Sequence, residues 1–199
     1  MPGRILRDLY GRGLEGKRCE LITTDGGNGL CNALEVVYPR IPRQHCWAHK
    51  TRNVLDKVKK ADQEKVKKDL QRISHAKNRQ AATQAYWSFC QKYRKAYPGA
   101  VKSLESEIDD LLSFYQVKLS LKERQGLDAK ELQQAQMMLW RKIRTTNLIE
   151  RAFREVKRRT RPMGVFGNRS SMERILYAVF YHYNSKGKEI PSFLFTQRA

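Results

Sequence analysis

The spacing of apolar residues changes along this chain and divides it into three zones. Residues 1–58 mix strand and helix signals in the order strand, helix, strand, helix. Residues 59–138 have helical periodicity with almost no strand signal, and residues 139–199 contain two further amphipathic helices. We therefore predict a mixed α/β fold, in which the first zone supplies a sheet with helices packed on it, the middle zone is an all-helical insertion and the third zone adds two helices to the first.

The strand signals of the first zone are two short apolar runs. The run RCELITT at 18–24 is rich in strand-forming residues and ends abruptly at the glycine-rich turn DGGNG, 25–29. Apolar residues then recur at helical spacing across 30–37. The second run lies around 43–46 and leads into a helix from about Trp47. This order is typical of a sheet on which helices pack.

Two apolar stripes predict helices in the middle zone. The first is formed by Val66, Leu70 and Ile73, and the second by Tyr86, Phe89, Cys90, Tyr93 and Tyr97. After a break at Pro98 and Gly99, the pattern resumes with Leu104, Ile108, Leu111 and Leu112. We interpret the second stripe as a core face rather than as a row of base-stacking platforms. Trp87 and Trp140 fall off this stripe, and one of them is a candidate for contact with nucleic acid.

The third zone has two helix start signals. Asn147 precedes Glu150 by three residues, and Ser170 precedes Glu173 by three, which is close to the capping-box pattern. In the second of these helices the apolar residues follow one face: Met172, Ile175, Leu176, Val179, Phe180 and Tyr183. We predict that this second helix is a core helix.

The charge of the chain restricts its partners. The 199 residues contain 40 Lys and Arg against 20 Asp and Glu, giving a net charge of +20 and a pI near 10.1. Such an excess favours a polyanion, either nucleic acid or an anionic membrane surface. The short apolar face of the basic helix at 147–161 makes the membrane surface the weaker choice. With 40% apolar residues, the chain can bury a core, which excludes full disorder.

The sequence has none of the features of a membrane or secreted protein. No window approaches 18 consecutive apolar residues, and the amino terminus has no secretory signal. The four scattered cysteines are typical of reduced thiols rather than of a disulfide framework. We therefore expect a soluble, intracellular protein without a membrane partner.

The densest positive charge surrounds a single carboxylate. Residues 141–161 hold nine basic and two acidic residues, and on a helix Leu148, Ala152, Phe153 and Val156 share one apolar face while Glu150 and the cations project elsewhere. One interpretation is a solvated basic helix in which Glu150 serves its own cap. The other is a carboxylate that holds a metal while neighbouring arginines bind phosphates with their planar guanidinium groups.

Asp25 is a second candidate ligand, because it lies where a predicted strand ends. In α/β folds ligands gather at the carboxyl ends of strands, and the glycines after Asp25 would let a substrate backbone approach closely. The same pattern also suits an ordinary turn in which Asp25 caps the next helix.

Cys46 and His49 form a third candidate feature, since a Cys and a His three residues apart at a helix start can face one site. This spacing occurs in zinc sites, but a closed zinc site needs four ligands. The other candidates offer no second pair at a comparable spacing: Cys19, Cys31, His45 and His75. We therefore favour a pair that packs beside another site over structural zinc.

These features occur together in an order that resembles a known family. The series TTDGGNGL, RQHCWAHKTRNVL, a long helical stretch and RTTNLIERAFREVKRRTRPMGVF is similar to the catalytic region of the Mutator-type transposases of bacterial insertion sequences. The resemblance covers nearly the whole chain. Its last block is the most specific, because Thr-Asn-x-x-Glu followed by Lys-Arg-Arg-Thr-Arg is a hallmark of the family.

The resemblance implies a fold, a reaction and site residues. The fold is a ribonuclease H-like sheet, here partial, which holds an Asp-Asp-Glu triad and is interrupted by a helical insertion. Asp25 matches the second catalytic Asp and Glu150 the catalytic Glu, and both would hold Mg²⁺ or Mn²⁺ for DNA strand cleavage and transfer. Cys46 and His49 match a pair that supports the centre. The basic residues expected to hold DNA are Arg151, Arg154, Lys157, Arg158, Arg159 and Arg161.

One departure from the family concerns the first catalytic Asp. Asp8 is the only Asp before Asp25, and no predicted strand precedes it. We therefore expect a carboxyl-terminal piece of a transposase that is inactive alone. The alternative is a non-catalytic basic DNA-binding remnant or regulator that occupies element ends. The partners implied are insertion sequence ends and target DNA, with homo-oligomers in the full-length family and a cytoplasmic, nucleoid-associated location.

Overall fold

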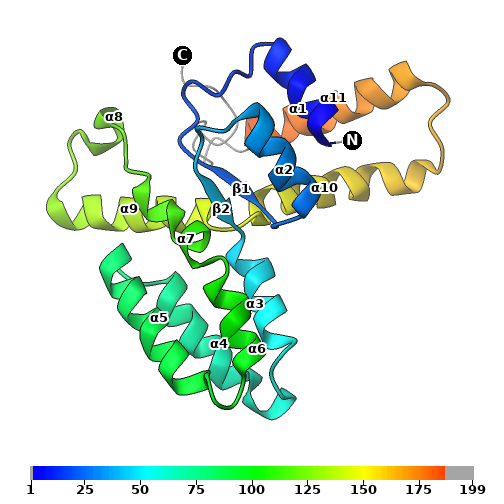
Figure 1. The fold of residues 1–199 in the computed structure, drawn as a ribbon. Coiled ribbons are helices and arrows are strands. Elements are labelled where there is room, and N and C mark those ends of the chain that lie inside the picture. The colour runs from blue at the N-terminus through cyan, green and yellow to red at the C-terminus, as the bar shows by residue number, and fades with distance from the viewer. Residues whose placement is uncertain (1, 187–199) are drawn as a thin grey trace. The chain divides into compact units, whose positions relative to one another are not determined.

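The computed structural model describes residues 2–186, with side chains described to residue 181. These residues divide into two compact units, the first ending at Thr146 and the second beginning at Asn147. Figure 1 labels the helices and strands of both units. No helix within the described residues is long and apolar enough to cross a bilayer.

The first unit holds most of the elements. They are α1 (Pro2–Gly11), β1 (Ile22–Thr24), α2 (Asn28–Val37), β2 (Arg43–His45), α3 (Trp47–Leu55), α4 (Lys60–Ser74), α5 (Arg79–Tyr93), α6 (Pro98–Glu105), α7 (Ile108–Leu111), the 3-10 helix η1 (Ser113–Gln116), α8 (Leu121–Arg124) and α9 (Ala129–Ile143). The second unit holds α10 (Asn147–Thr160), the 3-10 helix η2 (Arg161–Met163) and α11 (Arg169–Lys186).

The sheet of the first unit consists of two short parallel strands. β1 pairs with β2 so that Ile22, Thr23 and Thr24 lie opposite Arg43, Gln44 and His45. Both predicted strands are therefore confirmed, although β1 takes only the last three residues of the run at 18–24. The described chain is mostly helical with this one small sheet, which agrees with a mixed α/β class.

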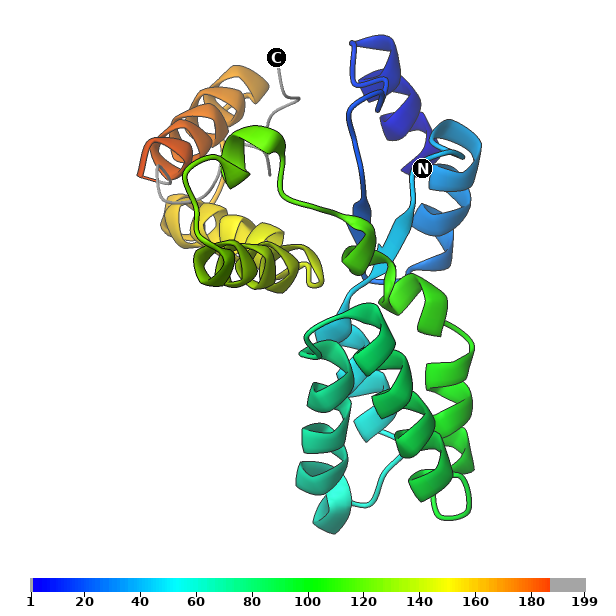
Figure 2. The ribbon, with the colours of Figure 1, turned by 90° about the vertical axis from the view of Figure 1, so that its left-hand side faces the viewer.

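Four helices build the main core, and they pack side by side in Figure 2. α4 contacts α3 and α5, and α6 contacts the same two helices. The predicted stripes are confirmed, because Val66, Leu70 and Ile73 of α4 and Tyr86, Phe89, Cys90 and Tyr93 of α5 are all buried. Between residues 59 and 138 the described chain contains helices and no strand, as the pattern predicts. The predicted stripe extends too far at one residue, since Tyr97 lies beyond the end of α5 and is only half-buried.

The two tryptophans that fall off the stripe behave differently. Trp140 is buried in α9 and donates a hydrogen bond from Nε1 to the carbonyl of Val117, 2.9 Å away, so it is a core residue. Trp87 is 56% exposed on α5, where its ring contacts that of Tyr86.

The second unit has much less buried surface. α10 and α11 contact each other, but among the described side chains only Ala152 is buried. The prediction that α11 is a core helix is therefore wrong in part. Most of its apolar stripe is half-buried, Phe180 is 38% exposed, and Tyr183 lies outside the described side chains. Its cap also differs from the prediction, because Asn168, and not Ser170, accepts a hydrogen bond from the backbone N–H of Ser171 at 2.8 Å.

Candidate active site

Asp25 lies directly beyond the carboxyl end of β1, with an exposed side chain. Its Oδ1 accepts a hydrogen bond from the backbone N–H of Gly27 at 3.1 Å. Gly27, not Asp25, precedes α2, and no side chain caps that helix. The interpretation of Asp25 as a helix cap is therefore wrong, and its carboxylate instead closes a local turn.

The turn after Asp25 depends on glycine. Gly26 has a φ of +86°, in the left-handed region where a side chain is strained. Its N–H donates to Oγ1 of Thr24 at 3.2 Å. A Cβ at Gly26 would lie 3.9 Å from Cε1 and Nδ1 of His45, so the turn packs over the imidazole of the neighbouring strand.

Cys46 directly follows β2, on the same edge of the sheet as Asp25, and His49 lies in the first turn of α3. Thr24 is paired with His45, and the N–H of Cys46 donates to the carbonyl of Thr24 at 2.8 Å. The buried Sγ of Cys46 accepts from the N–H and from Oγ1 of Thr146, both at 3.3 Å. Nδ1 of His49 lies 3.5 Å from the same hydroxyl. The Cys-x-x-His pair therefore contacts the last residue of the first unit.

Two further bonds tie the segment before Thr146 to the strand ends. Oγ1 of Thr23 donates to the carbonyl of Ile143 at 2.6 Å, and the N–H of Trp47 donates to the carbonyl of Arg144 at 3.0 Å. Together with the Cys46 contacts, these bonds fix residues 143–146 along the edge where both strands end. The segment that leads into α10 is thus tied to both strand ends by hydrogen bonds.

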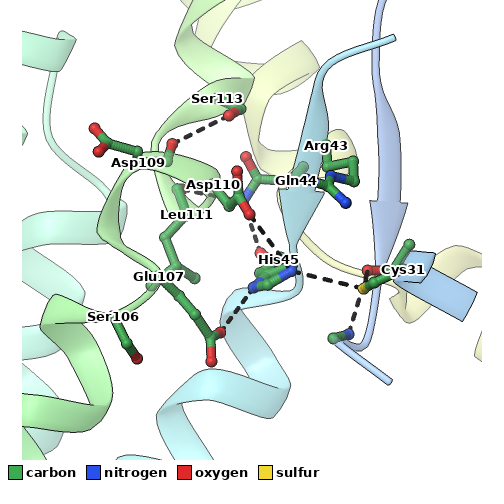
Figure 3. Close-up of polar contacts among 12 residues, drawn as sticks. Cys31, Arg43, Gln44, His45, Ser106, Glu107, Asp109, Asp110, Leu111 and Ser113 are labelled. Carbon is green, nitrogen blue, oxygen red and sulfur yellow. Dashed lines mark hydrogen bonds and ion pairs between the residues drawn. The ribbon is translucent and has the colours of Figure 1, made fainter. Parts of the chain in front are cut away.

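A polar cluster at the end of β2 was not predicted from the sequence, and Figure 3 labels three of its residues, His45, Glu107 and Asp110. Nδ1 of His45 lies 2.7 Å from Oε2 of Glu107, and Nε2 lies 3.7 Å from Oδ2 of Asp110. Lys50, which is buried, lies 2.6 Å from Oε1 of Glu107. We call His45, Lys50, Glu107 and Asp110 the His45 cluster. Only a tertiary contact joins these residues, so no local pattern signals it.

Gln44, also missed, joins β2 to the helical segment. Its Nε2 donates to the carbonyl of Leu111 at 3.0 Å, and its Oε1 accepts from the N–H of Phe114 at 2.8 Å. The side chain is fully buried, so these bonds satisfy an amide that has no access to water. Gln44 therefore connects the sheet with α7 and η1.

Glu150 lies in the first turn of α10, within the second unit, and is half-buried. The six basic residues predicted to hold DNA are all exposed there, five on α10 and Arg161 in η2. They fall into two groups. Glu155 binds Arg158 at 2.7 Å and Arg159 at 3.0 Å, and these two bonds lower the pKa of Glu155 to about 2. Within residues 2–186, no carboxylate pairs with Arg151, Arg154, Lys157 or Arg161.

The predicted site residues are thus divided between the units. Asp25, Cys46 and His49 share one edge of the sheet in the first unit, whereas Glu150 and the cations belong to the second. Among the described residues there is no group of three or more His, Cys, Asp and Glu side chains that could hold a metal ion.

Comparison with known families gives this arrangement its context. Residues 3–189 match the model of the transposase Mutator family. The chain belongs to the Mutator family of transposases. The match includes every motif on which the resemblance was based, from the Asp25 turn to the basic stretch of α10, so the predicted family is confirmed.

Named relatives agree with this membership. The chain is 42% identical over 156 residues to the transposase for insertion sequence element IST2 of Acidithiobacillus ferrooxidans, covering 78% of this chain and 46% of that protein. It is 32% identical over 182 residues to the transposase for insertion sequence element IS905 of Lactococcus lactis, covering 92% of this chain and 41% of the relative. This member of the Mutator family therefore spans less than half the length of these two relatives.

Proposed function

We propose that this chain supplies catalytic residues to a transposase of the Asp-Asp-Glu type, which cleaves and joins insertion sequence DNA on a ribonuclease H-like core. The observation that carries the proposal is the exposed carboxylate of Asp25 at the carboxyl end of a parallel strand, beside a turn of glycines. Ligands of α/β proteins gather at such strand ends, and small residues there leave room for a DNA backbone.

The proposed cofactor is Mg²⁺ or Mn²⁺, and the donor chemistry of the two carboxylates fits such hard cations. When bound, a pair of ions supplies an activated attacking oxygen and a stabilised leaving oxygen. Asp25 is exposed, and the one hydrogen bond to its Oδ1 leaves acceptor capacity for a cation. Glu150 is the second proposed ligand. Two carboxylates are few for a two-ion centre. We therefore propose that the third carboxylate of the triad comes from the part of the longer relatives that this chain does not span.

Cys46 and His49 have a supporting role in this proposal. Both contact Thr146, and Thr146 is followed directly by α10, on which Glu150 lies one turn along. We propose that the pair supports the centre by holding this end of the first unit, and that neither residue is itself a metal ligand.

The cations of α10 and η2 would bind the DNA backbone. Arginine guanidinium groups form paired hydrogen bonds to phosphate oxygens, and this contact is independent of base sequence. Arg151, Arg154, Lys157 and Arg161 are the first choice, because no described carboxylate neutralises them. DNA at element ends and at the target is the proposed partner, while self-association stays a prediction.

The test transfers this chain into the IST2 transposase, in place of the matching segment, and measures nicking of element ends in Mg²⁺. Asp25→Asn and Glu150→Gln should each reduce nicking at least about 100-fold while DNA binding is kept. Asp8→Asn and Glu173→Gln are matched controls, since both carboxylates are exposed and each is paired with an arginine four residues away in the chain. If both neutralised variants nick as well as the parent chimera, the ligand assignment is wrong.

The second candidate function is non-catalytic DNA binding at element ends. It is favoured by the cation-rich α10 and by the lack of a three-ligand group within the described residues. This function predicts that Arg154→Gln weakens DNA binding while Asp25→Asn changes nothing that can be measured. Nicking by the chimera that depends on Asp25 would contradict it.

A further inference from the structure

The His45 cluster begins with a buried cation. Nζ of Lys50 lies 2.6 Å from Oε1 of Glu107 and donates to the carbonyl of Ser103 at 3.0 Å. An ammonium group removed from water needs a carboxylate partner, and Glu107 supplies it. Burial raises the pKa of Glu107, but the bonds from Lys50 and His45 outweigh this and leave that pKa below its usual value. Glu107 is therefore an anion at neutral pH.

The second oxygen of Glu107 orients the imidazole of His45. Because a carboxylate accepts hydrogen bonds and cannot donate them, Nδ1 of His45 must be the donor in the 2.7 Å contact. This bond fixes both the ring plane and the nitrogen that holds the proton. In the neutral ring, Nε2 then accepts from Sγ of Cys31, 3.9 Å away.

From His45 two routes lead to the turn that positions Asp25. The first is direct packing, since the ring lies under Gly26 at van der Waals distance. The second is a series of hydrogen bonds. Sγ of Cys31 lies 3.9 Å from Oγ1 of Thr24, and the same hydroxyl oxygen accepts from the N–H of Gly26. Figure 3 shows His45 between Glu107 and Cys31.

We infer that Glu107, although it lies in the helical segment far from the sheet in sequence, is a positioning residue for the carboxylate of Asp25. It acts through the imidazole of His45, whose orientation determines where the Gly26 turn rests. The inference rests on the proposed role of Asp25. It also gives the helical segment a part in the site, because Glu107 lies between α6 and α7.

The experiment measures the turn itself and needs neither DNA nor metal. In the ¹⁵N-labelled chain at neutral pH, the Gly27 amide proton reports the hydrogen bond to Asp25, and Asp25→Ala defines the signal without that bond. Glu107→Gln should move the Gly27 signal at least half of the way towards the Asp25→Ala position, with a parallel shift at Gly26. Asp109→Asn is the matched control, because that side chain is 92% exposed in the same segment and should leave both signals unchanged.

A double variant separates positioning from stability. Lys50→Met with Glu107→Gln removes the buried cation together with its partner, so the chain should regain stability, while Nδ1 of His45 still lacks the carboxylate of Glu107. We expect the Gly27 signal to stay displaced in the double variant. If the single variant does not fold, the double variant still tests whether Glu107 positions the Asp25 turn. An unshifted Gly27 signal in either variant would overturn the inference. If the Gly27 signal moves as expected but nicking by the chimera does not depend on Asp25, the proposed function alone is contradicted.

Discussion

The two units differ in how they use their apolar residues. In the first unit, helices α3 to α6 enclose side chains with almost no exposure, such as Val66, Ile73 and Leu104. In the second, α10 and α11 leave Ile149, Phe153 and Tyr177 more than half exposed. The first unit is thus organised by packing, and the second presents charge on a helix pair with little core. Asp25 belongs to the first unit and Glu150 to the second, so one proposed ligand is backed by a packed core and the other by a helix pair with little core.

The largest expected effect tests this contrast in packing. Leu104→Ala should lower the free energy of unfolding of the first unit by roughly 2–5 kcal/mol, because the leucine is fully buried. The same change at half-buried Leu176 should cost about 1 kcal/mol or less. All three tryptophans lie in the first unit, so tryptophan fluorescence in urea follows that unit alone, whereas circular dichroism follows the helices of both. Equal losses in the two variants would end the distinction between the units.

Gln44→Ala tests whether the thin sheet depends on the helices for its stability. The change leaves the N–H of Phe114 without its buried acceptor, at a cost of roughly 1–3 kcal/mol, while the carbonyl of Leu111 keeps the bond from Nε1 of Trp47. The fluorescence midpoint in urea should fall accordingly. Gln116→Ala, at an exposed glutamine, is the control and should change the midpoint little. A Gln44→Ala midpoint equal to that of the control would show that the Gln44 connection contributes nothing to the stability of the first unit.

Cys46 tests the connection that leads from the first unit into α10. Cys46→Ala removes the acceptor of both Thr146 bonds, and nicking by the chimera should fall about 10-fold, equivalent to about 1.4 kcal/mol. Cys90→Ala deletes an equally buried thiol in the helical core and should lower stability without this loss of nicking. Cys46→Ser keeps an acceptor and should recover part of the activity. Identical nicking by the two alanine variants would remove Cys46 from the site.

Glu155 tests whether the second unit acts through its charge. Glu155→Gln frees Arg158 and Arg159, so DNA binding should tighten and the slope of log affinity against log salt should steepen by about 1. Glu173→Gln removes the same charge from α11, where it pairs with Arg169, and should have the smaller effect. Titration of a labelled DNA duplex at several salt concentrations measures both. Equal slopes in the two variants would mean that only total charge matters.

The smallest effect is a pH dependence in the first unit. The ion pair of Glu107 stabilises the folded state above the unfolded pKa of about 4.3, and this stabilisation is lost as the pH falls through the lower folded pKa. The stability difference between the wild type and Glu107→Gln should therefore shrink as the pH falls from 5 to 3. Urea midpoints at each pH measure it. A difference that stays constant with pH would mean that Glu107 acts through its shape and not its charge.

Local patterns predicted the elements that depend on neighbours in sequence. The strand ends, the Asp25 turn and the buried stripes of α4 and α5 follow from apolar spacing and from glycine, which are properties of a short window. The His45 cluster and the Gln44 connection were not predictable, because their partners lie more than 50 residues away in the chain. The burial of α11 was overestimated for a related reason, since an apolar stripe shows which face packs but not how much surface covers it.

Gln44 has a consequence for insertions into the chain. The path that leaves the sheet after β2 passes through four helices and returns to the same glutamine at Leu111 and Phe114, so both ends of a long excursion meet at one side chain. A loop that closes on itself in this way can grow or shrink without moving the strands beneath it. A reporter domain inserted in the connection between α4 and α5 should therefore leave the pairing of β1 with β2 intact.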